Sequence, residues 1–347
     1  MRWMAAALAL SERGRGRTAP NPNVGCVIVR EDRVVGRGWT QPGGRPHAEA
    51  MALAQAGAAA RGATAYVTLE PCAHESARGP ACSALLVEAG VARVVIALGD
   101  PDPRTNGAGI ARLESAGIAV TSGVLAAEAR QAMAGFLTRQ ALGRPQVTLK
   151  LATSLDGCIA LASGESRWIT GPEARAHAHL ERARHEAILV GRGTFEADAP
   201  RLDVRLPGLH DRSPHRVLLS SRHPRESGAP SPELARKSDG QELGPCFRGD
   251  DGEWQVIASP VAIATLPKVD HLLVEGGAAT AASFLAADLV DRLLLYRAPI
   301  LIGGGKPALG DIGLAHLPDA HGRWRLADSR SLGSDRLEAY LRHREAL

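Results

Sequence analysis

Three side chains in the first half of the chain have the chemistry of a zinc ligand set: His47, Cys72 and Cys82. One imidazole and two thiolates give a tetrahedral zinc three protein ligands and leave its fourth position to a water, as in catalytic zinc sites. Glu49 is too close in sequence to His47 to be a fourth ligand, but a carboxylate there can carry protons to and from that water. The sequence therefore predicts one zinc ion per chain, with Glu49 as the catalytic proton shuttle.

The spacing of these residues favours hydrolytic deamination. Zinc lowers the pKa of its bound water to about 7, and His-x-Glu followed by Pro-Cys and a later Cys is typical of zinc nucleobase deaminases. Pro46 and Pro71 each precede a ligand. We therefore expect His47 and Cys72 each to open a helix. Such a position would favour the thiolate of Cys72, because a helix N-terminus stabilises negative charge. Taken singly, a His-x-Glu or two widely spaced cysteines would be read as structural, whereas the combination favours catalysis.

Length and composition suit two globular domains. The chain has 347 residues, of which 45% are hydrophobic and 22% charged, as is typical of globular proteins. The formal charge is only +4 and the basic residues are scattered, so we expect a small-molecule substrate and no nucleic-acid partner. The number of subunits is left open, and a homo-oligomer is compatible with the sequence.

The N-terminus and the cysteines bear on location. Residues 1–11 contain an apolar run too short for a signal peptide and predict an amphipathic first helix, and no apolar run reaches the length of a membrane span. Cys26, Cys158 and Cys246 are expected to be free thiols in a reducing compartment. We therefore expect a cytoplasmic protein with no membrane segment.

Alternating elements must position the zinc ligands. The pattern predicts strands over residues 24–29, 34–39, 65–69 and 91–98, and helices over residues 48–60, 82–89, 109–116 and 125–142. Gly143-Arg144-Pro145 ends the last helix and marks a boundary. The first half is thus expected to be a layered α/β domain over residues 1–143.

The second half carries signs of a nucleotide site. A strand from Gln146 ends in the polar stretch 150–157, and a helix starts at Pro172. Glycines follow the strands at residues 186–190 and 272–274, and such turns let backbone N–H groups approach a phosphate, although an ordinary turn would have the same pattern. Ser221-Arg222 after the strand at residues 217–219 predicts NADPH, because an arginine there suits a 2′-phosphate. Residues 222–253 predict a surface loop or irregular hairpin.

Several motifs together resemble the bifunctional riboflavin biosynthesis deaminase/reductase family over nearly the whole chain. The motifs are Pro20-Asn21-Pro22-Asn23-Val24-Gly25-Cys26, His47-Ala48-Glu49, Thr68-Leu69-Glu70-Pro71-Cys72-Ala73-His74, Ser154-Leu155-Asp156-Gly157, Ala162-Ser163-Gly164-Glu165-Ser166-Arg167-Trp168-Ile169-Thr170 and Glu275-Gly276-Gly277. The resemblance implies an α/β protein with a cytidine-deaminase-like three-layer domain, residues 1–143, and a dihydrofolate-reductase-like domain, residues 146–347.

The resemblance also implies a substrate and site residues. The first domain would deaminate 2,5-diamino-6-ribosylamino-4(3H)-pyrimidinone 5′-phosphate with zinc, and the second would reduce the ribosyl group to ribityl with NADPH. By similarity, NADPH would be bound by Ala152, Trp168, Thr194, Asp198, Ser221 and Gly277. The substrate would be bound by Ser166, Arg182, Leu202, Arg205 and Glu275, of which the two arginines suit the phosphate. Lys150 and Glu275 are candidates for the proton donor of the reduction.

One departure and two alternatives stay open at this point. The segment 75–81 is one residue longer than the family's loop before the second cysteine, which leaves its substrate contacts undefined. The chain could be a nucleobase or tRNA deaminase with a non-catalytic nucleotide-binding second domain, although aromatic residues make up only 3% of it and stacking on aromatic side chains is usual in RNA recognition. It could also be a zinc-stabilised regulatory protein, against which the pairing of Glu49 with an open zinc site argues.

Overall fold

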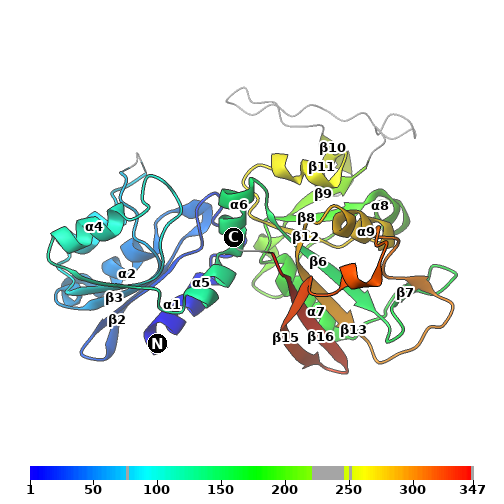
Figure 1. Ribbon diagram of the computed structural model, residues 1–347, viewed down its shortest axis with the longest axis horizontal. Coiled ribbons are helices and arrows are strands. Elements are labelled where there is room, and N and C mark those ends of the chain that lie inside the picture. Colours follow the sequence, from blue (N-terminus) through cyan, green and yellow to red (C-terminus); the bar gives the residue numbers. More distant parts are fainter. Residues whose placement is uncertain (76–77, 221–245, 250–251, 345–347) are drawn as a thin grey trace. The chain divides into compact units, whose positions relative to one another are not determined.

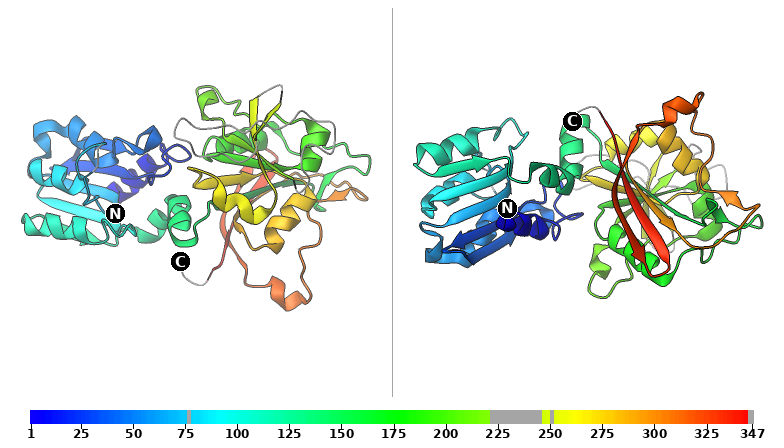
Figure 2. Two further views of the ribbon diagram at one scale, coloured as in Figure 1. Left: turned by 90° about the horizontal axis from the view of Figure 1, so that it is seen from above. Right: turned by 60° about the horizontal axis from the view of Figure 1, so that its bottom comes forward.

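The computed structural model describes residues 1–75, 78–220, 246–249 and 252–344. The chain divides into two compact units, Met1–Gly143 and Arg144–Leu347, each built around its own sheet (Figures 1 and 2). No described helix has the length and apolar character needed to cross a membrane.

The first unit is a five-stranded sheet between two layers of helices. Its strands, in spatial order, are β2 (Arg33–Trp39), β1 (Gly25–Arg30), β3 (Thr64–Leu69), β4 (Arg93–Leu98) and β5 (Ala119–Ser122). Its helices are α1 (Arg2–Ser11), α2 (Ala48–Ala56), α3 (Cys82–Glu88), α4 (Ala108–Ser115), α5 (Ala126–Ala132) and α6 (Ala134–Leu142). Strand β1 is antiparallel to β2 and β3, whereas β3, β4 and β5 are parallel. Helices α1 and α5 pack together on one face of the sheet, and α2, α3 and α4 follow one another on the other (Figure 1).

Small residues let helix α2 lie unusually close to the sheet. A Cβ added at Gly36 or Gly38 of β2 would come within 2.1 Å of a backbone oxygen of Ala52 or Ala48 in α2. No larger residue fits at these two positions without moving the helix. The glycines of β2 and the alanines of α2 therefore fix where this helix begins, directly after His47.

The second unit is built on a nine-stranded sheet. Its strands, in spatial order, are β10 (Cys246–Gly249), β11 (Gly252–Ile257), β9 (His215–Leu219), β8 (Ala187–Gly191), β12 (His271–Val274), β6 (Gln146–Thr153), β13 (Val290–Arg297), β16 (Asp335–Arg342) and β15 (Trp324–Leu332). The six strands from β11 to β13 in this order are mutually parallel, and antiparallel strands flank them on both sides. A two-stranded sheet joins β7 (Cys158–Ala160) to β14 (Lys306–Pro307).

Apolar strands of this sheet are covered on both faces. Leu189 of β8 packs with Phe284 of α9 (Ala278–Ala286), whereas its neighbour Ile188 packs with Phe195 of α8 (Arg192–Asp198) on the opposite face. Helix α7 (Pro172–Arg182) also covers the sheet, through the buried Ala174. Continuous burial of both faces explains why these central strands have no polar alternation in the sequence.

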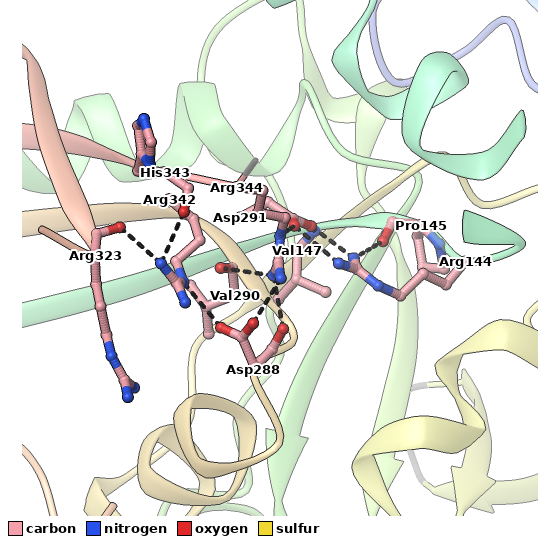
Figure 3. A network of polar contacts seen from close by, with 10 residues as sticks. All are labelled: Arg144, Pro145, Val147, Asp288, Val290, Asp291, Arg323, Arg342, His343 and Arg344. Atoms are coloured by element: carbon pink, nitrogen blue, oxygen red, sulfur yellow. Dashed lines mark hydrogen bonds and ion pairs between the residues drawn. The ribbon is translucent and has the colours of Figure 1, made fainter. Parts of the chain in front are cut away.

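Charged side chains tie the C-terminal end of β16 to the start of the sheet (Figure 3). Asp291 accepts two hydrogen bonds from the Arg144 guanidinium, at 2.7 and 2.9 Å, and one from the backbone N–H of Val147 at 2.9 Å. Arg344 donates to Asp291 and also to Asp288. The largely buried pair of Arg144 and Asp291 therefore joins the start of β6, the start of β13 and the residues after β16.

The predicted fold class is confirmed, and three local expectations are wrong. The predicted helix over residues 125–142 is two helices, α5 and α6, because Met133 between them has non-helical dihedral angles. The predicted helix over 48–60 ends at Ala56, and a 3-10 turn follows. Cys72 does not open a helix but lies in the irregular segment after β3. Residues 222–253 were predicted to be a surface loop or an irregular hairpin, and the described part consists of strand β10 and the start of β11, which pair as antiparallel strands.

Candidate active sites

The three predicted zinc ligands meet in the first unit. The ligand atoms of His47, Cys72 and Cys82 all lie within 4.8 Å of one another. His47 is the residue before α2, Cys82 is the first residue of α3, and Cys72 follows β3. Two helix starts and a strand end therefore converge on one point. This convergence gives the thiolate of Cys72 a helix N-terminus as a neighbour, because the Cys82 backbone N–H donates to the Cys72 sulfur over 3.3 Å.

The geometry of these side chains fits a tetrahedral metal. The Nδ1 atom of His47 lies 3.3 Å from the Cys82 sulfur and 3.7 Å from the Cys72 sulfur. Tetrahedral bonds of about 2.05 Å to nitrogen and about 2.3 Å to sulfur would separate these atoms by roughly 3.6 Å. The other ring nitrogen, Nε2, lies 3.1 Å from the amide nitrogen of Asn21, so that contact orients the ring with Nδ1 toward the thiols.

The surroundings of Cys72 and Glu49 shift their pKa values in opposite directions. Hydrogen bonds from the Cys82 thiol, from the His47 side chain and from the Cys82 backbone N–H together outweigh burial and lower the pKa of Cys72 to about 4. Burial raises the pKa of Glu49 to about 7, although the charge of His47 opposes this. Glu49 is 3% exposed and its carboxylate contacts Cys82. A carboxyl group with a pKa near neutrality, next to the zinc ligands, can both accept and donate a proton at pH 7.

Glu70 braces the segment that carries Cys72. Its buried carboxylate accepts hydrogen bonds from the backbone N–H groups of Asp100, Gly107, Gly109 and Ile110, at 3.0 to 3.3 Å. A carboxylate at the start of α4 also satisfies N–H groups that have no partner within the helix. Glu70 thus links the end of β3 to two further loops and fixes the backbone two residues before Cys72.

A cavity of about 340 Å³ opens beside the ligand cluster. Its lining includes His47, the buried Glu49 and Cys72, two prolines, further acidic residues and three arginines. Asp100, one of the lining acids, has its pKa raised to about 6 by burial. The cavity therefore offers a polar pocket whose lining includes two of the candidate metal ligands.

A second constellation lies at the carboxyl ends of the parallel strands in the second unit. Arg182, the last residue of α7, donates two hydrogen bonds to Glu275, at 2.8 and 2.9 Å, and Lys150 lies 3.9 Å from the same carboxylate. Burial would raise the pKa of Glu275, but the Arg182 charge and its hydrogen bonds prevail and lower that pKa to about 2. Glu275 is therefore an ionised carboxylate between two cations.

Predicted substrate residues gather around this pair. Arg182 also donates to the backbone oxygen of Asp203 at 3.1 Å, and Arg205 donates to the Asp203 carboxylate at 2.9 Å. Leu202 is on the same segment, but its side chain is buried in the core next to Ile188 and Val190. Both arginines therefore have a carboxylate partner, Glu275 for Arg182 and Asp203 for Arg205, but the Arg205 side chain is 55% exposed and that of Arg182 only 15%. The greater exposure makes Arg205 the more accessible of the two to a phosphate.

The two glycine-rich turns lie side by side. The hydroxyl of Thr194, near the start of α8, accepts the backbone N–H of Gly277, which precedes α9, over 3.2 Å. Gly191 and Gly276 both lie against Thr280. A Cβ added at Gly191 would come within 2.0 Å of the Thr280 side chain, and a Cβ added at Gly276 within 2.5 Å. Close backbone approach at two neighbouring helix starts is the arrangement that phosphate-binding turns use.

The remaining predicted residues lie as follows. Ala152 is on β6 opposite Tyr296 of β13. Ser166 and Trp168 are exposed in the segment before α7, with the Arg175 guanidinium 4.7 Å from the Trp168 ring centroid. Asp198 ends α8 and lies 3.8 Å from Arg167. Ser221, with the neighbouring Arg222, lies outside the described residues.

Some residues of these sites were not predicted. Asn21 was named only within a family motif and was given no role, whereas its side chain lies 3.1 Å from Nε2 of His47. No spacing pattern in the sequence distinguishes Glu70 and Asp100 from acidic residues that are exposed to solvent. The pairing of Arg182 with Glu275 joins residues 93 positions apart, and no local pattern could have revealed it.

Comparisons with known proteins match both units. Residues 1–98 match the family described as the cytidine and deoxycytidylate deaminase zinc-binding region, and residues 145–337 match the RibD C-terminal domain. The riboflavin biosynthesis protein RibD of Escherichia coli is 40% identical over 365 residues, which covers 96% of each chain. RibD of Aquifex aeolicus is 38% identical over 92% of each chain.

Solved structures agree over nearly the full length. A structure of Acinetobacter baumannii RibD has a TM-score of 0.83 at 36% identity, and covers 99% of this chain and 98% of its own. A diaminohydroxyphosphoribosylaminopyrimidine deaminase/5-amino-6-(5-phosphoribosylamino)uracil reductase from Thermotoga maritima has a TM-score of 0.81 at 31% identity over the same shares. With both family regions in order and full-length relatives at this identity, the chain belongs to the RibD family of bifunctional riboflavin biosynthesis enzymes, with a deaminase unit followed by a reductase unit.

Proposed function

We propose that residues 1–143 deaminate 2,5-diamino-6-ribosylamino-4(3H)-pyrimidinone 5′-phosphate and that residues 146–347 then reduce the ribosyl group of the product to ribityl. One observation carries the deaminase assignment: the His47, Cys72 and Cys82 cluster lies with the buried Glu49 beside a cavity. The reductase assignment rests on the glycine-rich turns and the Arg182–Glu275–Lys150 constellation at one edge of a parallel sheet.

In the deaminase unit, His47, Cys72 and Cys82 would hold zinc, which supplies hydroxide at neutral pH by lowering the pKa of a water. Glu49 takes the proton of that water on its carboxylate and passes it to the amino group that leaves as ammonia. The buried position of Glu49 supports both halves of this transfer, since a pKa near neutrality matches a group that is base first and acid later.

In the reductase unit, the turns at Thr194 and Gly277 would bind NADPH together with Ala152, Trp168, Asp198 and Ser221. When bound, NADPH supplies the hydride. Reduction at the ribosyl anomeric carbon opens the sugar, and its oxygen takes up a proton. Glu275 is ionised at neutral pH because its pKa is about 2, so it cannot give that proton. We therefore assign proton donation to Lys150, whose ammonium group lies 3.9 Å from Glu275, and substrate binding to Ser166, Arg182, Leu202, Arg205 and Glu275.

The composition supports a free nucleotide-like substrate rather than RNA. Aromatic residues make up 3% of the chain and the formal charge is +4, whereas RNA-directed enzymes combine basic surfaces with stacking side chains.

The deaminase assignment is tested with Glu49→Gln and, as a matched control, Glu88→Gln, which changes an exposed glutamate at the end of α3. Glu49→Gln should retain zinc in elemental analysis but lose ammonia release by about 10²- to 10⁴-fold, the usual contribution of proton transfer. It should still reduce substrate that is already deaminated, and Glu88→Gln should keep both activities. Zinc-loaded Glu49→Gln with parental ammonia release would disprove the role of Glu49.

A further inference from the structure

Three arginines line the deaminase cavity, and their surroundings differ. Arg104 is paired with Asp102 through hydrogen bonds from its Nε, at 3.0 and 3.1 Å. Arg78 donates to the backbone oxygen of Gly43 at 2.9 Å. Arg45 is half-buried, and within the part of the chain that the structure describes no carboxylate pairs with it. A guanidinium that is partly removed from water without a counter-charge is costly, so this position is favourable for an anion.

The carboxylates of the cavity are engaged elsewhere. Glu70 is held by backbone N–H groups, Asp102 by Arg104, and Glu49 lies against the zinc ligands. Asp100 accepts the backbone N–H of Asp102 at 3.0 Å. None of these acids is in ion-pair contact with Arg45 among the described residues. The charge of Arg45 is therefore open to a ligand in the cavity.

The backbone that carries Arg45 is held in place. Gln41 donates to the Pro46 oxygen at 3.0 Å, and Gly44 donates to the Gln41 oxygen at 2.9 Å. The side chain of Asn21, which also contacts His47, donates to the Gly44 oxygen at 2.9 Å. Arg45 is thus fixed two residues before a zinc ligand. Because this backbone is already ordered, binding a ligand has to restrict only the side chain of Arg45.

Arg45 and Arg78 approach the same part of the cavity wall. A Cβ added at Gly79 would lie 3.1 Å from Nη1 of Arg45, and Arg78 is the residue before Gly79. Arg78 in turn donates to Gly43, on the turn that carries Arg45. The cavity thus has two guanidinium groups on adjoining segments, and no carboxylate is paired with Arg45 in the described chain. Each guanidinium offers the N–H donors that match phosphate oxygens.

We propose that Arg45 binds the 5′-phosphate of the substrate while the aminopyrimidine ring is at the deaminase zinc site. This assignment rests on the proposed deaminase function and adds to it a residue that selects the phosphorylated substrate over its riboside. The ring belongs beside the buried Glu49 and Cys72, and the phosphate at the half-exposed arginine. Anchoring the remote phosphate lets binding energy position the ring for reaction.

The test measures ammonia release by the full chain with the 5′-phosphate substrate and with the dephosphorylated riboside. Arg45→Ala should reduce kcat/KM for the phosphorylated substrate roughly ten- to a hundredfold, mostly through KM, as expected for loss of a charged hydrogen bond. It should change kcat/KM for the riboside less than about twofold. Arg45→Lys should recover part of the loss, because it keeps the charge without the fork.

Arg33→Ala is the matched control, since it removes an exposed arginine at the start of β2 away from the cavity and should leave both substrates unaffected. Equal losses of Arg45→Ala on the two substrates would overturn the proposal and make Arg45 a support for His47. An unchanged preference for the phosphate would also overturn it. If the parent chain releases no ammonia from either compound, the deaminase function itself fails, and that outcome is distinct from a failure of Arg45 alone.

Discussion

Removal of the Glu275 charge should destabilise the reductase unit and abolish reduction. Glu275 is 9% exposed in its side chain and lies between Arg182 and Lys150. In Glu275→Leu, Arg182 would lose both hydrogen bonds to the carboxylate and would remain largely buried. A buried charge left without its partner typically costs about 3 to 5 kcal/mol.

The lowered pKa of Glu275 gives a second estimate of how much its charge stabilises the folded protein. The pKa of Glu275 is about 2, against an ordinary value of 4.5, and that difference corresponds to roughly 3 kcal/mol in favour of the folded state with Glu275 ionised. Because the folded-state pKa is the lower one, this stabilisation is fully present above about pH 4.5 and is lost as the pH falls toward 2. Glu275→Leu should therefore show no such loss over this range.

Hydrogen exchange measured by mass spectrometry can follow peptides from β12 and α7 separately from those of the first unit. Glu275→Leu should lower the protection of the second-unit peptides by about 3 kcal/mol, and those of the first unit should stay unchanged. The double variant Glu275→Leu with Arg182→Met should be more stable than the sum of the two single changes predicts, by about 2 to 3 kcal/mol.

Additive effects of the two substitutions would contradict this prediction, because they would mean that Arg182 and Glu275 do not stabilise each other. Activity gives a second criterion. The single variant should lose NADPH oxidation and keep ammonia release, and a variant with parental reduction would show that the carboxylate has no part in the reductase site.

Two further predictions concern stability. Asp291→Asn should lower the free energy of unfolding of the second unit by about 2 to 4 kcal/mol, measured by chemical denaturation, because Arg144 would lose its buried counter-charge; a change below about 0.5 kcal/mol would contradict the network in Figure 3. Gly109→Ala should destabilise the first unit by about 1 to 3 kcal/mol, because the new Cβ would lie 2.1 Å from the backbone oxygen of Pro71. Gly99→Ala is the matched control, since its Cβ would make only an ordinary contact at 3.8 Å. Equal melting temperatures of these two glycine variants would disprove the close approach.

Local patterns were sufficient to predict a layered α/β first unit and its boundary, whereas the two specific folds were implied by the resemblance to a known family. Alternating apolar segments, the glycine at residue 143 and the glycine-rich turns each follow from short patterns. The same local reasoning failed at Met133, where an alanine-rich stretch contains a break between two helices, although Gly135 in the first turn of α6 was a local signal of one. It also placed Cys72 on a helix, although the helix whose start it faces is that of Cys82.

The sites were predicted less completely than the fold, since contacts between distant segments determine them. His47, Glu49, Cys72 and Cys82 could be found from the sequence, because together they form the pattern typical of zinc deaminases. The partners that orient them, Asn21 and Glu70, come from other loops. The role proposed for Arg45 could not be predicted from the sequence, because it depends on which arginines of the cavity are paired with a carboxylate.

The most direct test of the account is mass spectrometry of the products formed from 2,5-diamino-6-ribosylamino-4(3H)-pyrimidinone 5′-phosphate, with and without NADPH. The zinc-loaded chain alone should convert the substrate to a product heavier by about one mass unit, because an amino group is replaced by a hydroxyl that tautomerises to a carbonyl, as in hydrolytic deamination. With NADPH, a second shift of about two mass units should follow, since a hydride and a proton are added. An unchanged substrate in both reactions, or a first product that NADPH leaves unaltered, would contradict the assignment of the two activities to the two units.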